Sequence, residues 1–501
     1  MKNNEYEVIV VGASNAGGMA AAAAAEKGAK VLVIDKAGSA GYLYRETIAA
    51  LHSKAQTKAG VSVDRNELVN FLSTFNQGNV DQNLLNIWAD NSSEMMDWLD
   101  DEILRPHGAY IQATPDAYYE TERNRAFPTG NEVTAPDGKY WQMGYGDWVI
   151  AKAEELGAEF AWRTKLEKLI VENGRVVGVN VKDVKTNKMT TVKATKGVIL
   201  CTGGYGSNKA LMQKWNPLGL KTNVYTDSQR DDGSGIVAAM EVGAAKDEEP
   251  ASIVFNRGAV PTATNTDDFY EVDLTPPDDP GYLWLGSYPM LKVNLNGERF
   301  FNESAPYQFQ MNAASKQPGY LSAMIWTEKT MSDENLRKYH TLGCSRLGFP
   351  GIFTGDEARK EVNDRLSEGL VQKADTIKEL AEKLGLPVVN LQNSVTRYNE
   401  MVAADKDDDF GKESYRLEPV TEAPYYGAIV GGRLLATLDG LRVNSKMQVL
   451  NKQGEVIAGL YAAGNCSGGF FWGSYPDHVP GLTASHALTF GRLAGKYIAE
   501  A

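Results

Sequence analysis

Short apolar runs and a stretch of small residues at the start of the chain predict a strand, a helix and a second strand. Glu7 to Val11 (EVIVV) is a continuous apolar run of strand length that ends in a glycine-rich turn. Met19 to Glu26 (MAAAAAAE) consists of strong helix formers, and Gly28 follows as a helix stop. Lys30 to Asp35 (KVLVID) has the pattern of a buried strand. Together these segments predict one βαβ unit.

Strand patterns return further along the chain. Val176 to Val184 and Met189 to Ala194 alternate like the two strands of a hairpin, and Gly197 to Leu200 (GVIL) is a short buried strand that runs into two glycines. After Thr437 the pattern is again rich in strands, which we expect at Gly440 to Val443, Met447 to Asn451 and Gly459 to Ala463, before a closing helix at Gly481 to Gly495. The two ends of the chain therefore share an α/β pattern.

The middle of the chain has a different character. A cluster of Pro, Asp and Gly at Pro276 to Gly281, a polar helical stretch at Thr376 to Asn399 and an acidic loop at Asp405 to Asp409 interrupt the α/β pattern. We expect a domain inserted between the two halves of a discontinuous α/β domain. The expected boundaries are 1–250, 251–435 and 436–501.

The composition limits the kind of partner that this chain can have. Its 501 residues carry a formal net charge of -13, which argues against a nucleic-acid or anionic-membrane partner, since either would favour a basic face. No apolar stretch reaches the roughly 18 to 20 residues that span a bilayer, so no membrane insertion is expected. The three cysteines form no CxxC pair and predict neither a disulfide framework nor a metal site. We expect a cytoplasmic protein.

Val10 to Gly18 (VVGASNAGG) has the position and most of the residues of a dinucleotide-binding fingerprint. It follows a strand and opens a helix, and Asp35 lies about 20 residues further on, where it can bond a ribose hydroxyl. Gly12 suits the tight turn and Gly17 the close helix packing, while Ser14 replaces the middle glycine. The start of the helix would face a pyrophosphate. Because NAD(P) and FAD both use this motif, the motif alone leaves the cofactor open.

A second small-residue turn near the end of the chain indicates which dinucleotide is bound. Gly459 to Gly464 (GLYAAG) is a strand running into a turn, and Gly481 to Gly495 is a helix that begins directly after a Pro-Gly pair. The free N–H groups and positive dipole end of such a helix stabilise the negative charge of a reduced flavin. A nicotinamide has no such need, so the two half-sites together predict FAD.

Several of these segments belong to a longer series of motifs. The chain resembles the flavoprotein family of soluble fumarate reductases and 3-ketosteroid dehydrogenases, whose motifs occur here in order as VVGASNAG, CTGGYGSN (201–208), DDGSGIVAAMEVGA (231–244), NGERFFNE (296–303), GLYAAGNCSGG (459–469) and GLTASHALTFGRLAG. The resemblance implies a discontinuous, Rossmann-like FAD-binding domain with an inserted α+β capping domain. It also implies that substrate binds between the isoalloxazine ring and the cap.

The same resemblance implies a set of FAD contacts. Where the fumarate reductases have an acidic residue after AAG this chain has Asn465, and their AGG segment reads Ile48-Ala49-Ala50-Leu51 here. Both changes are compatible with FAD binding. The candidate contacts are Gly12, Ser14, Ala16, Gly17, Asp35, Lys36, Gly41, Ala49, Ala50, Thr202, Gly203, Gly204, Asn465, Leu482 and Thr483.

Four positions at which fumarate reductases hold or protonate a dicarboxylate are changed in this chain. The resemblance places Tyr307 at the proton-donating arginine, Ala436 and the segment Ser252 to Val254 at two histidines, and His478 at an anchoring arginine. A charge-assisted hydrogen bond to a carboxylate is worth roughly 1.5 to 3 kcal/mol. We therefore expect a dicarboxylate to bind poorly, and fumarate reduction not to be the reaction.

Aromatic residues take the place of the lost anchors. In segments expected near the flavin or the cap these are Tyr42, Tyr44, Tyr282, Trp284, Tyr288, Tyr307, Phe470, Phe471, Trp472 and Tyr475. Such a pocket suits a flat, mostly neutral substrate. With hydride carried by flavin N5, the resemblance makes Tyr307 the first candidate for proton transfer and Tyr475 the second. His478 is a candidate acid or carbonyl donor, or else a loop residue that caps the following helix.

Three functional interpretations stay open. The first is an FAD-dependent reductase or dehydrogenase acting on a C–C bond next to a carbonyl or aromatic system of a steroid-like or flavonoid-like substrate. The second is a reductase of a small unsaturated monocarboxylate, of the urocanate or cinnamate type, anchored by Arg257, Arg433 or Arg346. The third is a non-catalytic electron-transfer flavoprotein. Without a haem or iron–sulfur motif, we expect an external electron donor or acceptor, either a reduced nicotinamide or a flavin or iron–sulfur protein.

Overall fold

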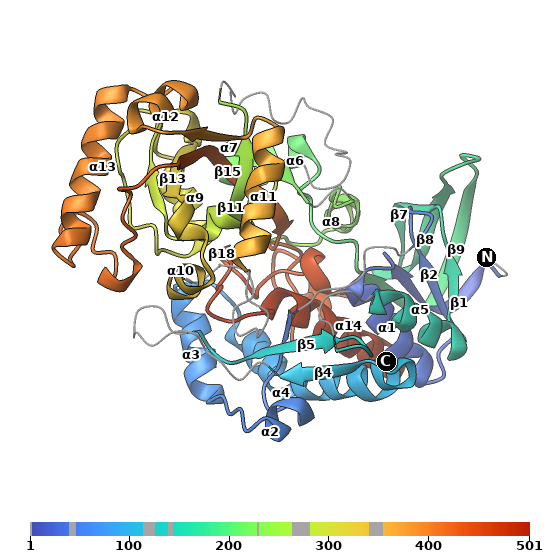
Figure 1. Cartoon of the computed structure of the whole chain (residues 1–501). Helices are drawn as coiled ribbons and strands as arrows, with labels where there is room; N and C mark the ends of the chain where they lie inside the picture. The colour runs from blue at the N-terminus through green and yellow to red at the C-terminus, as the bar shows by residue number, and fades with distance from the viewer. Residues whose placement is uncertain are drawn as a thin grey trace.

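The computed structural model of the chain describes residues 3–39, 47–113, 126–138, 144–227, 230–262, 281–339 and 354–501. These residues form two lobes, one containing both ends of the chain and the other its middle (Figure 1). No helix in the described ranges is long and apolar enough to cross a membrane.

The expected βαβ unit is the centre of the first sheet. Strand β1 (Glu5–Val11) runs parallel to β2 (Val31–Ile34), and helix α1 (Asn15–Glu26) connects them. On its other side β1 pairs in parallel with β9 (Met189–Leu200), which pairs in parallel with β17 (Val456–Ala462) from the far end of the chain. The predicted α/β fold class is thereby confirmed.

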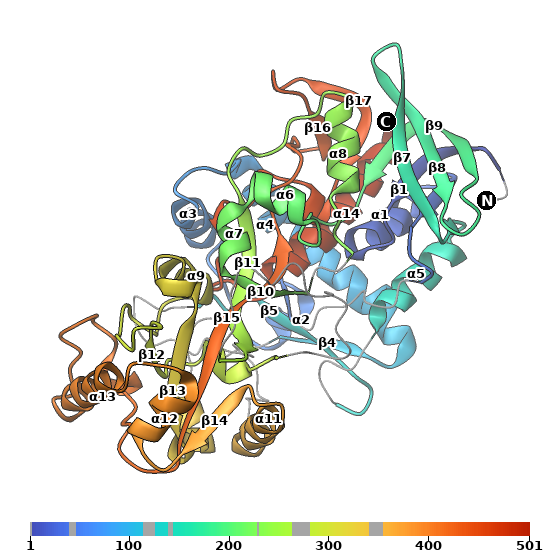
Figure 2. The same ribbon diagram turned by 90° about the horizontal axis from the view of Figure 1, so that it is seen from above.

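Shorter strands and a hairpin complete this sheet. β6 (Glu159–Ala161) and β16 (Gln448–Leu450) lie at its edges. β7 (Thr164–Glu172), β8 (Arg175–Asp183) and β9 form an antiparallel arm that projects from the lobe (Figures 1 and 2), so the predicted hairpin is confirmed. The expected strand at Gly440 to Val443 is wrong, because this segment makes only isolated bridges.

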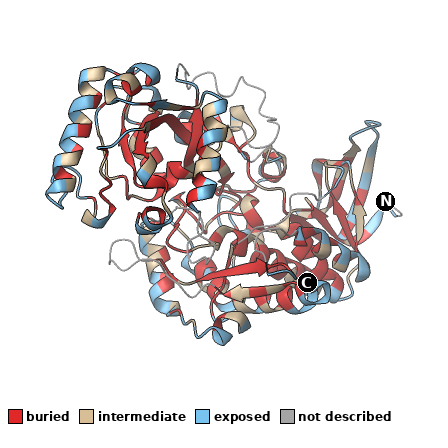
Figure 3. Cartoon of the chain, in the orientation of Figure 1, coloured by how far each residue is buried: buried red, intermediate tan, exposed pale blue. Residues whose placement is uncertain are grey.

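Helices and a small sheet cover the first lobe. The small sheet consists of β3 (Thr47–Ala49), β5 (Gly130–Thr134) and β4 (Tyr110–Ala113), and β3 lies against α14 (Leu482–Glu500). The other α-helices of the described residues up to position 250 are α2 (Lys54–Lys58), α3 (Arg65–Phe75), α4 (Gln82–Trp98), α5 (Tyr145–Glu155), α6 (Lys209–Trp215), α7 (Pro217–Thr222) and α8 (Ser234–Glu241). Figure 3 shows buried residues concentrated in the sheets and on inner helix faces.

The second lobe is built around one long strand, β15 (Tyr425–Thr437). Its partners are β10 (Asn223–Thr226), β11 (Ala251–Val260), β13 (Ser322–Thr327) and β14 (Val371–Ala374), and the sheet is extended by β12 (Leu291–Val293) and β18 (Gly473–Ser474). The helices of this lobe are α9 (Tyr307–Ala314), α10 (Asp333–Lys338), α11 (Gly355–Ser367), α12 (Ile377–Leu384) and α13 (Val388–Ala403). The helical stretch expected at 376–399 is thus two helices, because Gly385 ends the first with a φ of 70° and Pro387 follows.

Two short strands connect the lobes. β10 lies before residue 251 and β18 after residue 436, yet both pair with strands of the second sheet. The boundaries 1–250, 251–435 and 436–501 remain a proposal about the order of the domains along the chain. In space, both segments of the first domain contribute a strand to the sheet of the other.

The acidic loop at Asp405 to Asp409 takes part in a buried ion cluster. Arg299 donates to Glu303 and to Asp407, each at 2.7 Å, and the Lys412 ammonium lies 3.4 Å from Glu303. Burial acts to raise the pKa of Asp407, but its hydrogen bonds with Arg299 prevail and lower this pKa to about 2. The loop is therefore attached to the NGERFFNE motif within the second lobe.

A close helix contact joins the two ends of the chain. Helix α14 packs along α1, which is buried from Ala16 to Ala25. A Cβ atom at Gly491 would overlap the carbonyl oxygen of Ala16, and one at Gly495 that of Ala20, both well inside the 3.0 Å that Cβ atoms keep from their neighbours. Glycine at these two positions allows the helix backbones to touch.

We expect Gly495→Ala to destabilise the protein, because the added methyl group meets backbone atoms that cannot move aside. Overpacking of this kind costs about 1 to 3 kcal/mol, which outweighs a gain in helix propensity of about 1 kcal/mol. Urea unfolding measures the difference. Gly144→Ala is the control, since a Cβ atom there would meet only the Asp147 side chain, at 3.8 Å. Equal stability of the two variants would contradict the close contact.

Candidate active site

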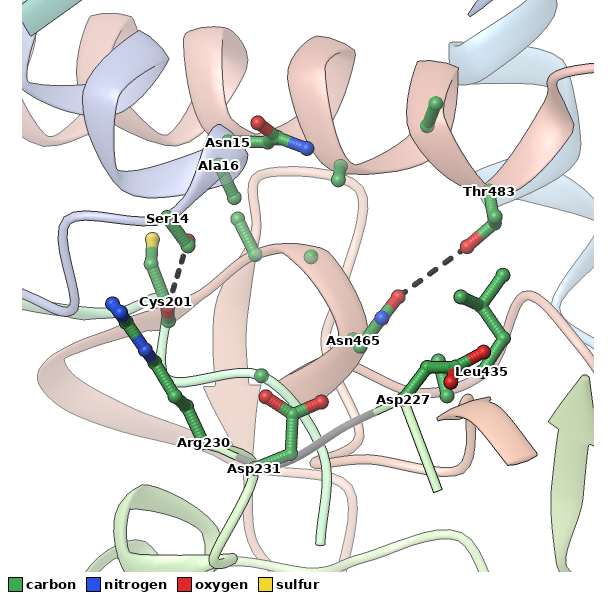
Figure 4. A pocket seen from close by; sticks show the side chains of 16 residues that line it. Ser14, Asn15, Ala16, Cys201, Asp227, Arg230, Asp231, Leu435, Asn465 and Thr483 are labelled. Carbon is green, nitrogen blue, oxygen red and sulfur yellow. Dashed lines mark hydrogen bonds between the residues drawn. The ribbon is translucent and has the colours of Figure 1, made fainter. Parts of the chain in front are cut away.

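The main cavity opens between the starts of α1 and α14 and has a volume of 340 Å³ (Figure 4). The first lobe contributes these helix starts and the turn after β17, and the end of β15 closes the cavity from the second lobe. The lining residues labelled in Figure 4 are Ser14, Asn15, Ala16, Cys201, Asp227, Arg230, Asp231, Leu435, Asn465 and Thr483.

A smaller cavity of 80 Å³ continues the main one toward the end of β2. Ser14, Cys201 and Gly203 line both cavities. The smaller one is also lined by Gly12, Asp35, Lys36 and Thr202. The two cavities form one elongated space that has Asp35 at one end and Thr483 at the other.

Glycine and serine residues shape the turn between β1 and α1. Gly12 has a φ of 98°, and a Cβ atom there would overlap the Cys201 carbonyl oxygen, just as one at Gly17 would overlap the Gly12 carbonyl oxygen. Ser14 caps α1 by accepting a hydrogen bond from the Gly17 N–H (3.2 Å), and its hydroxyl donates to the Cys201 carbonyl (2.8 Å). These two bonds hold the side chain against the protein, so serine can stand at the position of the usual second glycine.

Backbone donors hold Asp35 at the other end of the space. Its carboxylate accepts hydrogen bonds from the N–H groups of Ala13 (2.8 Å) and Ala37 (2.7 Å). Each carboxylate oxygen keeps a lone pair that can accept from a ribose hydroxyl. Lys36 pairs with Asp232 at 2.7 Å, which places its charge beside the same cavity.

The other predicted FAD contacts divide into lining and supporting residues. Ala16, Thr202, Gly203, Asn465 and Thr483 line the cavities, and the Thr483 hydroxyl lies 3.4 Å from Asn465 Oδ1. Residues buried behind the lining are Gly17, Ala49, Ala50, Gly204 and Leu482. Among these, the Ala49 N–H donates to the Gly481 carbonyl at 3.1 Å and so ties β3 to the start of α14. Gly41 lies outside the described residues, as do Tyr42, Tyr44 and Arg346.

Sequence reasoning did not single out Asp227, Arg230, Asp231 or Leu435 as site residues. Asp231 begins the DDGSG motif, which was an available signal. Asp227 and Leu435 reach the cavity only because β10 and β15 pair in the second sheet, a contact between segments about 200 residues apart. Ala436, at the position of a lost family histidine, does line the cavity.

The fold and the elongated cavity define a dinucleotide-binding protein of the two-lobed flavoprotein class. The chain belongs to the FAD binding domain family, whose profile matches residues 7–478. It is 26% identical to the vinyl phenol reductase of Lactiplantibacillus plantarum over 100% of this chain and 97% of that protein. FAD is therefore its cofactor, and the chain is a flavin-dependent oxidoreductase.

Two solved structures share the fold. A 3-ketosteroid delta1-dehydrogenase from Sterolibacterium denitrificans aligns with a TM-score of 0.75 at 19% identity, covering 99% of this chain and 100% of that chain. The open conformation of a flavocytochrome c3 fumarate reductase aligns with a TM-score of 0.71 at 24% identity, covering 99% of this chain and 78% of that chain. At these identities the two structures support the fold alone.

The Tyr475 hydroxyl is engaged at the start of α14. It accepts a hydrogen bond from the Leu482 N–H (2.9 Å) and donates to the Val479 carbonyl (3.3 Å). Since Gly481 at the N-cap has no side chain, Tyr475 supplies the cap for this helix. Its proposed role in proton transfer stays a prediction, but the hydroxyl already has a structural task.

Tyr307 is the first residue of α9 and is 4% exposed. Its ring packs against Phe255 at 4.8 Å. Burial, reinforced by the Asp477 carboxylate, raises the pKa of Tyr307 well above its usual value. The phenol is thus a stable proton carrier that only a strong base, such as a substrate carbanion, deprotonates.

His478 is enclosed by aromatic rings. Phe71 lies 4.9 Å and Phe75 5.7 Å from its ring, and its Nδ1 atom lies 3.6 Å from Asp477 Oδ1. Burial lowers the pKa of His478 to about 4. The imidazole is therefore neutral at pH 7 and can donate a hydrogen bond, but it is not an imidazolium acid.

Two arginines suggested as carboxylate anchors are already paired. Arg433 donates to Asp227 at 2.7 Å, and Arg257 donates to the Tyr282 hydroxyl at 2.9 Å and to Ser287. Both side chains are buried. The charge of Arg433 is therefore compensated by the Asp227 carboxylate, and the Arg257 guanidinium is held by two hydroxyl groups.

We expect Tyr475→Phe to lower stability and FAD affinity more than the rate of proton transfer. The substitution removes the shorter of the two hydrogen bonds of the buried Leu482 N–H, at 2.9 Å, and leaves only the 3.3 Å bond to the Val479 carbonyl. A lost hydrogen bond of this kind costs about 0.5 to 1.5 kcal/mol. Urea unfolding and FAD titration measure these effects. Tyr497→Phe, which removes a hydroxyl from α14 itself, is the control. A variant with wild-type stability and a large loss of rate would instead make Tyr475 a proton donor.

Acid is expected to destabilise the fold through two buried neutral histidines. Burial lowers the pKa of His486 to about 3, and that of His478 to about 4. Below about pH 6.5 the unfolded chain binds these protons while the folded chain does not, so the free energy of unfolding falls as pH decreases toward these values.

At pH 5 each histidine lowers the free energy of unfolding by roughly 2 kcal/mol relative to its value at pH 7. His486→Leu should remove the contribution of His486 to this acid sensitivity, because leucine does not titrate. Leucine also fits between the rings of Phe470 and Phe490, which lie 4.6 and 4.5 Å from the His486 ring. Unfolding in urea at both pH values checks this. The exposed His52 provides the control variant H52Q. An H486L protein as acid-sensitive as the wild type would refute the explanation.

Proposed function

We propose that this enzyme reduces a carbon–carbon double bond conjugated to an aromatic ring or a carbonyl, in a flat and largely neutral substrate. The relative named as a vinyl phenol reductase, which the chain matches over its whole length, supports this substrate class. Flavonoid-like and steroid-like enones belong to the same class. The observation that carries the proposal is that the buried Arg433, two residues before the cavity-lining Leu435, is already paired with Asp227.

A carboxylate substrate would have to compete with the protein for these cations. Binding it at Arg433 requires breaking the 2.7 Å bond to Asp227, which itself lines the cavity. Once that bond is broken, the Asp227 carboxylate would repel the carboxylate of the substrate. Each lost charge-assisted hydrogen bond costs roughly 1.5 to 3 kcal/mol. A neutral substrate avoids this cost and the repulsion.

The proposed roles combine the lining of the elongated space with the family resemblance, and the role of Tyr307 rests on its place after the RFFNE motif. Bound FAD supplies the hydride. Gly12, Ser14, Asp35 and Gly203 hold the dinucleotide in the elongated space, and Thr483 and Asn465 lie at its far end. Tyr307 gives its hydroxyl proton to the substrate carbon that does not receive hydride. Tyr475 keeps the start of α14 in place beneath this reaction.

Electrons must reach the flavin from outside the chain. We propose a reduced nicotinamide or a flavin or iron–sulfur protein as the donor, because the sequence carries no haem or iron–sulfur motif of its own. The cytoplasmic location expected from the cysteine content also remains a proposal.

Anaerobic reoxidation of the photoreduced enzyme tests the proposal. We expect a vinyl phenol or a neutral enone to reoxidise the flavin much faster than a hydroxycinnamate, and fumarate slowest of all. Tyr307→Phe should lower the rate with the neutral substrate about 100-fold or more, since general acid catalysis contributes about 10² to 10⁴. The oxidised flavin spectrum and the stability of this variant should match the wild type.

Other outcomes have definite meanings. Faster reoxidation by the hydroxycinnamate would favour the monocarboxylate reductase and show that Arg257 or Arg433 is released from its partner. If no alkene competed with dioxygen, the protein would be an electron-transfer flavoprotein and the proposal would be wrong.

A further inference from the structure

The loop between β18 and α14 carries two adjacent buried groups that lack hydrogen-bond partners. Asp477 is 4% exposed, and within the described residues no donor reaches its carboxylate oxygens with good hydrogen-bond geometry, the N–H of Tyr307 lying nearby. The Nδ1 atom of His478 is also buried and without a hydrogen bond there, 3.6 Å from Asp477 Oδ1. A buried polar group left unsatisfied costs about 1 to 3 kcal/mol, so two such neighbours call for a functional reason.

Titratable groups from two elements face Asp477. Tyr307 reaches it from α9, and Tyr475 and His478 belong to its own loop. The charge of Asp477 raises the pKa of both tyrosines, after the larger effect of their burial. Arg257 and Tyr282 act on Tyr307. Asp477 therefore lies within electrostatic reach of the proposed proton donor.

Burial raises the pKa of Asp477 to about 7, although the backbone N–H of Tyr307 acts in the opposite direction. At neutral pH the carboxyl group is thus present in both protonation states. The pKa of Tyr307 is raised well above 10, so a Tyr307 phenolate is a stronger base than the Asp477 carboxylate. A proton moves downhill from the Asp477 carboxyl to a Tyr307 phenolate.

We propose that Asp477 is the proton reservoir of Tyr307 and is itself recharged from solvent through His478. The proposal rests on the proposed function and adds the source of the proton. As the Tyr307 O–H bond breaks toward the substrate carbon, the Asp477 O–H bond breaks and its proton passes to the phenolate oxygen. In one concerted step, His478 Nε2 takes a proton from hydronium while its Nδ1 proton passes to the Asp477 carboxylate, so that the ring stays neutral and water is left. A flip of the ring then restores the starting tautomer. No electrons move in these steps.

His478 is suited to this transfer by its place between the interior and the surface. Its side chain is 11% exposed, while that of Asp477 is 3% exposed. Phe75, which packs against its ring, also lines a separate cavity of 310 Å³. Asp477 and His478 act through Tyr307 and are positioning residues, whereas Tyr307 alone meets the substrate.

A structural alternative is that Asp477 only stabilises α9. Its carboxylate lies near the N–H of Tyr307, the first residue of this helix, and Pro306 at the N-cap offers no side-chain hydrogen bond. In that case Asp477 resembles Asp64, whose carboxylate caps α3 by accepting from the Glu67 N–H at 2.8 Å. Asp64→Asn is therefore the matched control for loss of the negative charge at a helix start, since asparagine keeps the capping acceptor.

The test compares the wild-type holoenzyme with Asp477→Asn, Asp477→Glu and Asp64→Asn. The first measurement needs no turnover: a carbonyl stretching band of a protonated carboxyl should appear in infrared spectra, titrate near pH 7, and be absent from D477N. The second is the single-turnover reoxidation rate with vinyl phenol as a function of pH. The wild-type rate should fall as pH rises through about 7, and D477N should be at least about tenfold slower below that pH and show no such step.

The outcomes separate this proposal from the proposed function. D477E should restore both the infrared band and the step, and D64N should leave both as in the wild type, with at most a small change in the thermal unfolding midpoint. A D477N enzyme that keeps the wild-type pH profile and loses only stability would overturn the proton-reservoir role and leave the reductase intact. A wild-type enzyme that no alkene reoxidises would overturn the proposed function, and this inference with it.

Discussion

Helices α1 and α14 approach so closely that a Cβ atom at Gly491 or Gly495 would overlap carbonyl oxygens of α1. This contact brings the dinucleotide turn at Gly12 and the helix start at Thr483 to the same cavity, although they lie more than 450 residues apart in the 501-residue chain. The rest of the first lobe follows from it. β9 and β17 pair beside β1, and the inserted lobe begins and ends at this sheet.

The second lobe completes the wall of the cavity. β15 carries Arg433 and ends at Leu435 and Ala436 in the cavity wall, and β10 presents Asp227 to Arg433. This pairing neutralises a cation that could otherwise hold a carboxylate. The same architecture thus supports different chemistry when side chains at the end of one strand change, as expected when function depends on the site more than on the fold.

Local patterns were sufficient to predict the βαβ unit and the hairpin. They worked because apolar runs such as Val8 to Val11, and helix formers such as Ala20 to Ala25, point to the same element at every position. The strand expected at Gly440 to Val443 failed because that segment finds no continuous partner strand.

Contacts between distant segments could not be predicted in this way. Asp407 pairs with Arg299 over 108 positions, and Asp477 meets Tyr307 from another lobe, so neither carboxylate carries a local signal of its burial. The predicted FAD contacts came from motif order, which locates residues near the cofactor without separating those that line the cavity, such as Asn465, from those that support it, such as Gly204. The roles of Tyr475 and His478 depended on hydrogen bonds and ring contacts that only the fold creates.

The proposed function requires the enzyme to prefer a neutral, flat ligand, and equilibrium binding to the oxidised enzyme tests this preference without any turnover. Ethyl phenol and hydroxyphenylpropanoate form a matched pair, since both carry the phenol ring and only the second has a carboxylate. Perturbation of the flavin absorbance yields a Kd for each. We predict that the neutral phenol binds at least about tenfold more tightly, equivalent to about 1.4 kcal/mol. Tighter binding of the carboxylate would contradict the account.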